Sequence, residues 1–380
     1  MNFDPEVWGR VPFHFWTITF FAFGCIVGSF LNVCIHRMPR GESIVSPPSH
    51  CPYCNYSIPW YLNIPLLTWI YLRGKCANCK APISVRYLLV ELLTGILFAA
   101  CWLKYGQTSA LLALILCIFI AGLIASTFID FEHFIIPDEI TIGGIVVGFI
   151  LSFLVPLMHF RIDNIKGNWQ ILRLDTSSDS MIQSLKGILI GGGLLYGILR
   201  LGKLFFGRQR IALEPGTNVI FTETGIKWPG NEIDYGDVLY RGSDTIKLHA
   251  RKLEMIDRCY SDVEMSLRQD QLRVGEDLFN PDQILHLEAV TDEIILPREA
   301  MGLGDVKFMA AIGAFLGWPA VLFSLAFSSF IGSIVGVTLV LLKKKEWSNR
   351  LPYGPYISMA VVVWLFLGMD WLRLWLKTFP

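Results

Sequence analysis

The sequence is short of charge. Only 17% of its 380 residues are Asp, Glu, Lys or Arg, whereas an ordinary globular domain has ~25%. The 32 basic and 32 acidic residues cancel, so the net charge predicts neither a nucleic-acid-binding protein nor an acidic tail. Nine cysteines are too few for a secreted disulfide scaffold of this length. The sequence also shows no fixed-period repeat and no low-complexity tract.

Apolar residues are abundant instead, at 53% of the chain, with 12 Trp and 26 Phe. A helix needs roughly 20 apolar residues to cross a bilayer, and eight runs reach or approach that length. The sixth run is short, and the number falls to seven if it merges with the seventh. We therefore expect an all-α polytopic membrane protein with about eight transmembrane helices. The runs are about Val11–Ile35, Tyr87–Leu103, Ala110–Ile129, Ile140–Leu157, Ile188–Phe206, Val306–Leu316, Pro319–Leu342 and Tyr356–Leu374.

The few charges predict the orientation. Asp4 and Glu6 precede the first run, which argues against a secretory signal peptide. Basic residues follow it, so the positive-inside rule places the N-terminus outside and the next loop in the cytoplasm. Most other basic clusters then also fall inside. The inside clusters are Arg37 and Arg40, then Lys75, Lys80 and Arg86, then Arg208 and Arg210, then Lys343, Lys344, Lys345 and Arg350. One loop is an exception to the positive-inside rule. The loop His159–Ser180 falls outside although it contains Arg161, Lys166 and Arg173.

We divide the chain into a first span (1–36), a cytoplasmic loop (37–86), a membrane core in two parts (87–206 and 300–380) and a polar insertion between them (207–299). The insertion holds more than half of all Asp and Glu.

Strand-like segments in the insertion are separated by Pro-Gly and Arg-Gly turn signals. Examples are Asn218–Thr222 and Val238–Tyr240. The pattern predicts a small β-rich cytoplasmic domain, with a possible helix near Ser261–Leu272.

The cytoplasmic loop 37–86 is called the cysteine loop below. It has two Cys-x-x-Cys pairs with 21 residues between them. Each pair presents two thiolates on one turn, and two pairs complete a tetrahedral zinc site. Thiols on the cytosolic side stay reduced, which favours a metal over a disulfide, although free or redox-active cysteines are the alternatives. A site closed by four thiolates orders a loop rather than carrying out chemistry. The predicted zinc ligands are Cys51, Cys54, Cys76 and Cys79. The other cysteines, mostly in apolar runs, fit small buried side chains.

Two aspartates stand at the edges of apolar runs. Asp130 ends the third run and Asp305 precedes the sixth, both on the predicted cytoplasmic side. Ionisable residues at this depth are functional candidates. Two adjacent carboxylates share a proton, so one can activate water while the other polarises a peptide carbonyl. The alternative is that each is only an interfacial cap, a role that fits Asp138 at the next helix start better.

Many short motifs, in order along most of the chain outside the insertion, resemble those of the type IV prepilin peptidases. The matching segments are Gly28–Val33, His36–Pro39, Pro47–Cys54, Asn63–Pro65, Leu72–Cys76, Ile83–Tyr87 with Glu91, Ile129–Asp130, Ile136–Asp138 with Thr141, and Gly302–Lys307.

The resemblance implies that Asp130 and Asp305 are the catalytic pair, Asp305 lying in a GxGD motif shared with other intramembrane aspartyl proteases. It implies that the cysteine loop binds zinc and is associated with methyl transfer. Similar enzymes act in the bacterial cytoplasmic membrane. They cut the basic leader from type IV prepilins or type II secretion pseudopilins at the cytoplasmic face, then methylate the new N-terminus with S-adenosylmethionine. Because all four cysteines are present, the chain resembles the bifunctional members.

The insertion departs from typical members, and its acidic bias suggests the hypothesis that it recognises the basic leader. The alternative is a neutral, lineage-specific domain. The residues that bind S-adenosylmethionine are unknown, since no GxGxxG follows a strand in the cysteine loop, and Gly191–Gly193 fits helix packing better. Two other functions stay open from the residues alone: a transporter or channel whose carboxylates relay protons or cations, and a zinc-dependent membrane scaffold.

Overall fold

A computed structural model describes residues 13–165, 168–206, 208–239, 244–281, 286–297, 302–342 and 351–377. The chain forms two compact units, one of residues 1–196 with 302–380 and one of residues 197–301, and each is described by itself. Several residues used above lie outside the described ranges. These are Asp4, Glu6, Val11, Lys166, Tyr240, Lys343, Lys344, Lys345 and Arg350.

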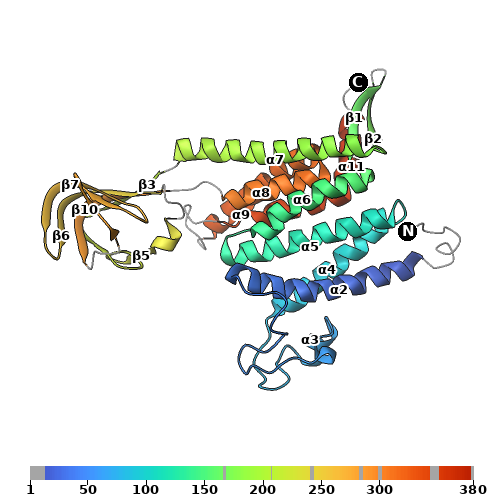
Figure 1. Ribbon diagram of the computed structural model, residues 1–380, viewed down its shortest axis with the longest axis horizontal. Helices are drawn as coiled ribbons and strands as arrows, with labels where there is room; N and C mark the ends of the chain where they lie inside the picture. Colours follow the sequence, from blue (N-terminus) through green and yellow to red (C-terminus); the bar gives the residue numbers. More distant parts are fainter. Residues whose placement is uncertain are drawn as a thin grey trace. The chain divides into compact units, whose positions relative to one another are not determined.

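The first unit is a bundle of long helices that run side by side (Figure 1). Six described segments are long and apolar enough to cross a membrane. α6 and α8, with 17 and 14 residues, are shorter than the ~20 residues that a membrane crossing needs. The predicted number of eight spans is therefore not confirmed. The helices are α2 (Phe13–Arg37), α4 (Val85–Tyr105), α5 (Ala110–His133), α6 (Asp138–Leu154), α7 (Ser177–Phe206), α8 (Leu303–Leu316), α9 (Trp318–Leu341), α10 (Gly354–Val363), a π-helical turn (Trp364–Gly368) and α11 (Met369–Lys377).

The sixth and seventh apolar runs form separate helices. α8 ends at Leu316 and α9 begins at Trp318. Gly317 between them has φ 75°, a backbone conformation that glycine adopts without the steric cost of a side chain. Pro319 then occupies the first turn of α9, where its missing N–H costs no hydrogen bond.

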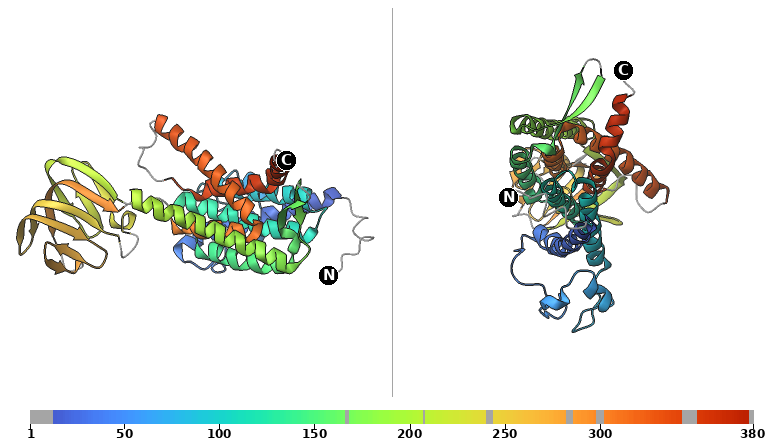
Figure 2. Two further views of the ribbon diagram at one scale, coloured as in Figure 1. Left: turned by 90° about the horizontal axis from the view of Figure 1, so that it is seen from above. Right: turned by 90° about the vertical axis from the view of Figure 1, so that its right-hand side faces the viewer.

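Close glycine contacts hold α8 between two neighbours. A Cβ on Gly313 of α8 would lie 2.1 Å from the backbone oxygen of Gly187 on α7. On the other side, a Cβ on Gly148 of α6 would lie 2.8 Å from the Phe315 ring. Gly191 also packs against the backbone of α8 and Gly192 against Ala310, so the packing role expected for Gly191–Gly193 holds for these two, whereas a Cβ on Gly193 would have nothing within 4 Å. Small residues let helix backbones approach closely in membranes, so these glycines fix the position of α8. Figure 2 shows the helix bundle from two further sides.

Irregular and strand segments complete this unit. The cysteine loop contains a short 3₁₀ turn (Trp60–Leu62) and a short helix, α3 (Leu67–Tyr71). The loop expected at His159–Ser180 contains a hairpin of β1 (Phe160–Ile165) and β2 (Asn168–Arg173), followed by the first turn of α7.

The second unit is an eight-stranded antiparallel sheet in the order β5-β4-β3-β10-β6-β7-β8-β9. Its core is a cluster of buried apolar side chains from strands across the sheet. The first and last strands pair with each other, Arg208 opposite Pro297, so the chain enters and leaves the sheet at one place. The strands are β3 (Arg208–Phe221), β4 (Gly225–Trp228), β5 (Asn231–Asp234), β6 (Ile246–Met255), β7 (Cys259–Leu267), β8 (Leu272–Val274), β9 (Asp277–Phe279) and β10 (Leu287–Pro297).

This sheet corrects three predictions. The name all-α is too narrow for a chain with a sheet of this size. The possible helix near Ser261–Leu272 is wrong, because Val263, Met265 and Leu267 alternate on one face of β7, and that period of two favours a strand over local helix preference. Val238 and Leu239 are not a strand either. Both side chains are buried, and the two residues follow a 3₁₀ turn. Adjacent side chains on a strand point to opposite faces, so two neighbours cannot both be buried when one face is exposed.

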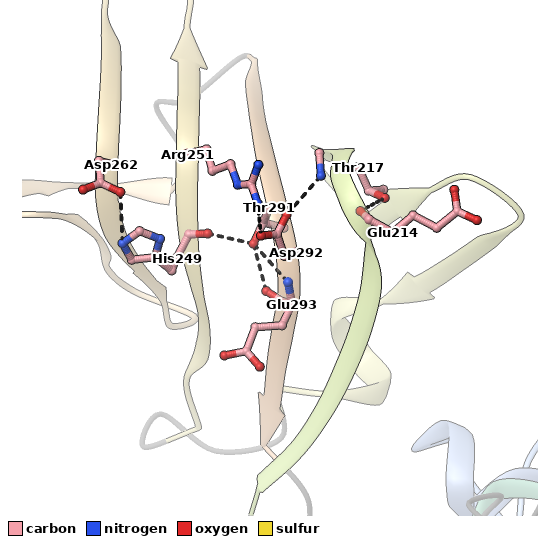
Figure 3. A network of polar contacts seen from close by, with 9 residues as sticks. Glu214, Thr217, His249, Arg251, Asp262, Thr291, Asp292 and Glu293 are labelled. Atoms are coloured by element: carbon pink, nitrogen blue, oxygen red, sulfur yellow. Dashed lines mark hydrogen bonds and ion pairs between the residues drawn. The ribbon is translucent and has the colours of Figure 1, made fainter.

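A polar network joins three central strands where β10 bulges between Thr291 and Glu293 (Figure 3). Asp292 accepts a hydrogen bond from the Gly216 N–H at 3.0 Å and forms an ion pair with Arg251 on β6. Thr291 Oγ1 donates to the His249 carbonyl at 2.7 Å. Bulges leave backbone groups out of register, and these side chains satisfy them. The Gly216 N–H and then Arg251 lower the pKa of Asp292.

Candidate active site and metal centre

Asp130 lies in the last turn of α5 and is only 5% exposed. The helix ends four residues later, where Phe134 adopts a left-handed conformation and its N–H bonds to the Asp130 carbonyl at 3.0 Å. The carboxylate accepts a hydrogen bond from the backbone N–H of Gly354, with 2.8 Å between that nitrogen and Oδ2. Because Gly354 is the first residue of α10, the end of one helix and the start of another meet at this side chain.

Asp305 is in the first turn of α8 and is 9% exposed. Its carboxylate interacts electrostatically with that of Asp130, although the two residues lie on opposite sides of the insertion in sequence. A Cβ on Gly302 would be 3.6 Å from Asp305 Oδ2, so the backbone of the GxGD motif lies close against the carboxylate. The fold thus brings the two predicted catalytic residues to one buried place.

The α5–α6 loop passes between these two residues. A Cβ on Gly304 would lie 3.4 Å from the Ile136 Cβ, and one on Gly354 would lie 3.3 Å from its Cδ1. Ile136 therefore packs against the start of α8, which carries Asp305, and against the start of α10, whose Gly354 contacts Asp130.

Beyond this loop, Asp138 at the start of α6 forms an ion pair with Lys307 of α8 at 2.6 Å. The interfacial role expected for Asp138 thus includes a partner on the helix that carries Asp305.

Sequence reasoning missed Gly354, Ile136 and Lys307 as parts of this site. A proline in the first turn, as in Gly354-Pro355, is a local signal for a helix start. Nothing in the sequence indicated that this start would meet Asp130, because the contact joins residues 224 positions apart.

Two buried carboxylates that share one proton can act as a general base and a general acid. The base removes a proton from water while the protonated partner hydrogen-bonds a carbonyl oxygen. Asp130 is contacted by the Gly354 backbone and Asp305 by the Gly302 backbone, the apolar Ile136 packs beside both helix starts, and the exposed Asp138–Lys307 pair lies next to them. This arrangement suits hydrolysis of an amide bond.

The four predicted metal ligands also converge. The sulfur atoms of Cys51, Cys54, Cys76 and Cys79 all lie within 4.8 Å of one another. Cys51 Sγ and Cys79 Sγ are 3.8 Å apart, which is close to the ~3.8 Å edge of a tetrahedron with ~2.3 Å zinc–sulfur bonds. The residues therefore fit a zinc ion, which would order the loop.

The two Cys-x-x-Cys segments form the same turn. In each, the N–H of the first cysteine donates to the carbonyl five residues on, Tyr56 or Ala81, at 3.0 and 2.8 Å. In each, the residue after the second cysteine, Asn55 or Lys80, has positive φ and donates back to the first cysteine. The N–H groups of Cys79 and Asn78 lower the pKa of Cys76 to about 6, and thiolates are the form that binds zinc.

Polar contacts tie the cysteine loop to the bundle, some part-buried and some exposed. Arg37, at the end of α2, donates to the carbonyls of Ser43 at 3.0 Å and Pro47 at 2.8 Å. Arg86 of α4 forms an ion pair with Glu132 of α5, two residues after Asp130. The metal centre and the carboxylate pair are thus joined through neighbouring helix ends.

The matches with known proteins agree with this arrangement. Residues 22–105 match the bacterial peptidase A24 N-terminal domain, and residues 284–337 match the type IV leader peptidase family. Residues 207–283 of the insertion fall between the two matched segments, and the second match begins at residue 284, just before the last strand of the insertion. No solved structure is significantly similar to this chain.

Three of the curated relatives that this chain matches carry the name prepilin leader peptidase/N-methyltransferase. The protein from Aeromonas hydrophila is 27% identical over 94% of this chain and 93% of its own length. The one from Pseudomonas aeruginosa is 24% identical over 93% of this chain and 91% of its own length. The Myxococcus xanthus protein is 49% identical, over 37% of this chain and 42% of its own length. The chain thus matches both domains of the type IV leader peptidases and is similar to curated members over more than nine tenths of its length, and its helices are those of a multi-pass membrane protein.

Proposed function

We propose that this protein removes the leader peptide of type IV prepilins or type II secretion pseudopilins at the cytoplasmic membrane face, and then N-methylates the new N-terminal residue with S-adenosylmethionine. The observation that carries the proposal is the meeting of Asp130 and Asp305 in one buried site. Curated relatives that are named for both activities support it.

The reaction follows from the two carboxylates. One removes a proton from water, which attacks the carbonyl carbon of the peptide bond after the leader. The other, protonated, donates a hydrogen bond to the carbonyl oxygen, and a proton then passes to the departing amine. The Gly354 N–H, 2.8 Å from Asp130 Oδ2, holds that carboxylate in position.

The domain assignment follows the same proposal. Residues 37–86 carry zinc on four cysteines and serve methyl transfer, while 87–206 and 300–380 form the peptidase core. Residues 207–299 are a cytoplasmic insertion. The basic residues near the loop ends place these parts on the inner side of the bacterial inner membrane.

The test is purified protein incubated with a membrane-reconstituted prepilin, followed by mass spectrometry. A mass loss equal to the leader identifies the peptidase, and a further methyl increment identifies the transferase. Asp130→Asn and Asp305→Asn should each lower cleavage by ~10²–10⁴-fold, the usual contribution of a general acid or base. Glu139→Gln, an exposed carboxyl in the first turn of α6, is the matched control.

Normal cleavage by either Asp variant would exclude the proposed site. No cleavage by the parent protein would leave the transporter and scaffold alternatives.

A further inference from the structure

The cysteine loop carries an exposed apolar face that the proposed function does not use. Leu67, Ile70 and Tyr71 of α3 are 66%, 60% and 81% exposed. Their spacing of i, i+3 and i+4 places them on one side of the helix. Trp60 and Tyr61, in the 3₁₀ turn before it, are also exposed. These five residues are called the interfacial face below.

The opposite side of α3 is packed. A Cβ on Gly74 would lie 2.8 Å from the Trp69 ring, and Trp69 Nε1 donates to the Ile83 carbonyl at 3.4 Å. α3 therefore has one side turned into the loop and one side uncovered by the described residues. Soluble surfaces rarely expose contiguous apolar areas of this kind without a partner.

A buried carboxylate fixes the depth of α3. Glu91 of α4, only 8% exposed, accepts a hydrogen bond from the Leu66 N–H with 2.8 Å between the atoms. Glu91 lies six residues into α4, ~9 Å along the axis at 1.5 Å per residue. α4 is a candidate membrane span from Val85 to Tyr105. Leu66 is thus held beside the span, and Figure 1 shows α3 alongside α2 rather than beyond its end.

The charge of the surrounding segment points to the same partner. Residues 43–86 contain Arg73, Lys75, Lys80 and Arg86 but no Asp or Glu. A zinc ion held by four thiolates would offset only part of this positive charge. Basic residues next to Trp, Tyr and Leu are typical of segments that lie in the interface of membranes containing anionic lipid.

We propose that the interfacial face lies in the headgroup and upper acyl region of the bilayer, so that the cysteine loop is a membrane-bound element and its metal centre is held at the lipid surface. The partner is phospholipid, with anionic headgroups near Arg73 and Lys75. The surface is continuous with the lipid-facing side of α4, where Leu89, Leu92 and Leu93 are exposed.

The test is photocrosslinking from the full-length, zinc-loaded protein in nanodiscs of phosphatidylcholine and phosphatidylglycerol. p-Benzoylphenylalanine replaces Ile70 in one variant and Tyr71 in a second, where an exposed aromatic is exchanged for another. The control carries it at Asn78, an exposed polar residue of the second Cys-x-x-Cys turn. Zinc content, measured for all three, shows that the loop is folded.

Positions 70 and 71 should give phospholipid adducts on the order of tenfold above position 78, because the probe reacts only with C–H groups in contact and the interfacial face is inserted. Equal yields at the three positions would overturn the proposal. Adducts with a co-reconstituted prepilin in place of lipid would also overturn it and assign the face to the substrate.

Lipid identity tests the charge argument. The adducts should be enriched in phosphatidylglycerol over its share of the bilayer, and the double variant Arg73→Gln, Lys75→Gln should lose this enrichment while keeping the adducts. Enrichment that persists in the double variant would overturn the proposed headgroup contact. None of these readouts requires catalysis, so failure of the proposed function would not be confused with failure of this inference.

Discussion

At the scale of single residues, the carboxylate pair depends on contacts with backbone. Asp130 receives its 2.8 Å hydrogen bond from Gly354, and Gly302 lies against Asp305. A Cβ at Gly354 would compete with the Asp130 carboxylate for space, whereas one at Gly302 would make an ordinary contact with Asp305 at 3.6 Å. The environment of each acid is therefore determined as much by glycine backbone as by the acids themselves.

Gly354→Ala tests this contact. The added Cβ would lie 2.8 Å from Asp130 Oδ2, so the carboxylate must move and its hydrogen bond lengthens. We expect cleavage to fall roughly 10- to 100-fold, the rate equivalent of the ~1.5–3 kcal/mol typical of a hydrogen bond to a charged group. Cleavage is measured on a reconstituted prepilin. Gly193→Ala, where an added Cβ has nothing within 4 Å, should be unchanged, and wild-type cleavage by Gly354→Ala would contradict the prediction.

Cys54→Ser tests the metal centre. Removing one of four thiolates should release zinc and lower methylation by ~10-fold or more, since metal sites lose affinity steeply with an altered ligand shell. Cleavage should change much less, because Asp130 and Asp305 are carried by other elements. Metal content and the masses of the two products are measured together. Cys259→Ser, an exposed cysteine outside the cluster, is the control, and equal loss of both activities would argue against separate sites.

At the scale of helices, the position of Asp305 depends on how α8 crosses α7. Gly313 and Gly187 meet backbone to backbone, with a hypothetical Cβ only 2.1 Å from an oxygen. No side chain fits there unless the helices separate. Since Asp305 is on α8, this crossing also positions the active site.

Gly313→Ala should therefore separate α7 from α8. We expect a loss of about 1–3 kcal/mol in stability, typical of overpacking, with reduced cleavage and unchanged zinc content. The measurements are the thermal unfolding midpoint and the cleavage rate. Gly143→Ala on α6, with nothing within 4 Å of the added Cβ, should be neutral or slightly stabilising, as expected from helix propensity. The reverse order of stabilities would refute the crossing.

At the scale of strands, the Asp292 network gives the sheet a pH dependence. The folded-state pKa of Asp292 is lowered by the Gly216 N–H and by Arg251. A lowered pKa contributes stability above the unfolded value, about 3.8, and this contribution is lost as pH falls through the folded value.

The β3 amides near Gly216 should accordingly become less protected from hydrogen exchange as pH falls below about 3.8. Hydrogen exchange with mass spectrometry of the full chain measures this protection, after correction for intrinsic rates. Asp292→Asn should show weaker protection at neutral pH and should lack this part of the pH dependence. Identical pH profiles for the two proteins would contradict the assignment.

At the scale of the whole molecule, the insertion is closed on itself. β3 and β10 pair at their outer ends, with Arg208 opposite Pro297. Paired strands lie ~5 Å apart, so a short linker can replace the whole sheet. The segment 207–299 has 18 acidic and 11 basic residues, and its negative charge suits a basic leader.

Replacing residues 208–297 by a short Gly-Ser linker should preserve cleavage of a prepilin with a neutral leader. Cleavage of the native basic leader should fall about tenfold at low ionic strength, with the difference shrinking as salt is added, because charge attraction speeds encounter. The ratio of the two rates is measured with and without the insertion. An unchanged ratio would mean that the insertion does not select the leader.

The sequence alone predicted much of this protein because its signals are local. Apolar runs located most helices within a few residues, although α7 begins at Ser177, well before the predicted Ile188. The spacing of Cys51, Cys54, Cys76 and Cys79 predicted the cluster that the structure brings together. The motifs around Asp130 and Asp305 indicated the family. In the insertion, the local helix preference of Ser261–Leu272 gave a wrong prediction. Pairing with neighbouring strands determines the conformation of this segment, which forms β7.

Only the tertiary structure decided what depends on contacts between distant residues. It placed Gly354 on Asp130, made α8 and α9 separate helices, and tied Leu66 to Glu91 beside a membrane span. It also showed that α6 and α8 are shorter than full spans. The physical reason is that the composition of a segment determines whether it leaves water. Which segments meet is determined by backbone hydrogen bonds and close glycine packing, and the order of residues along the chain does not show these contacts.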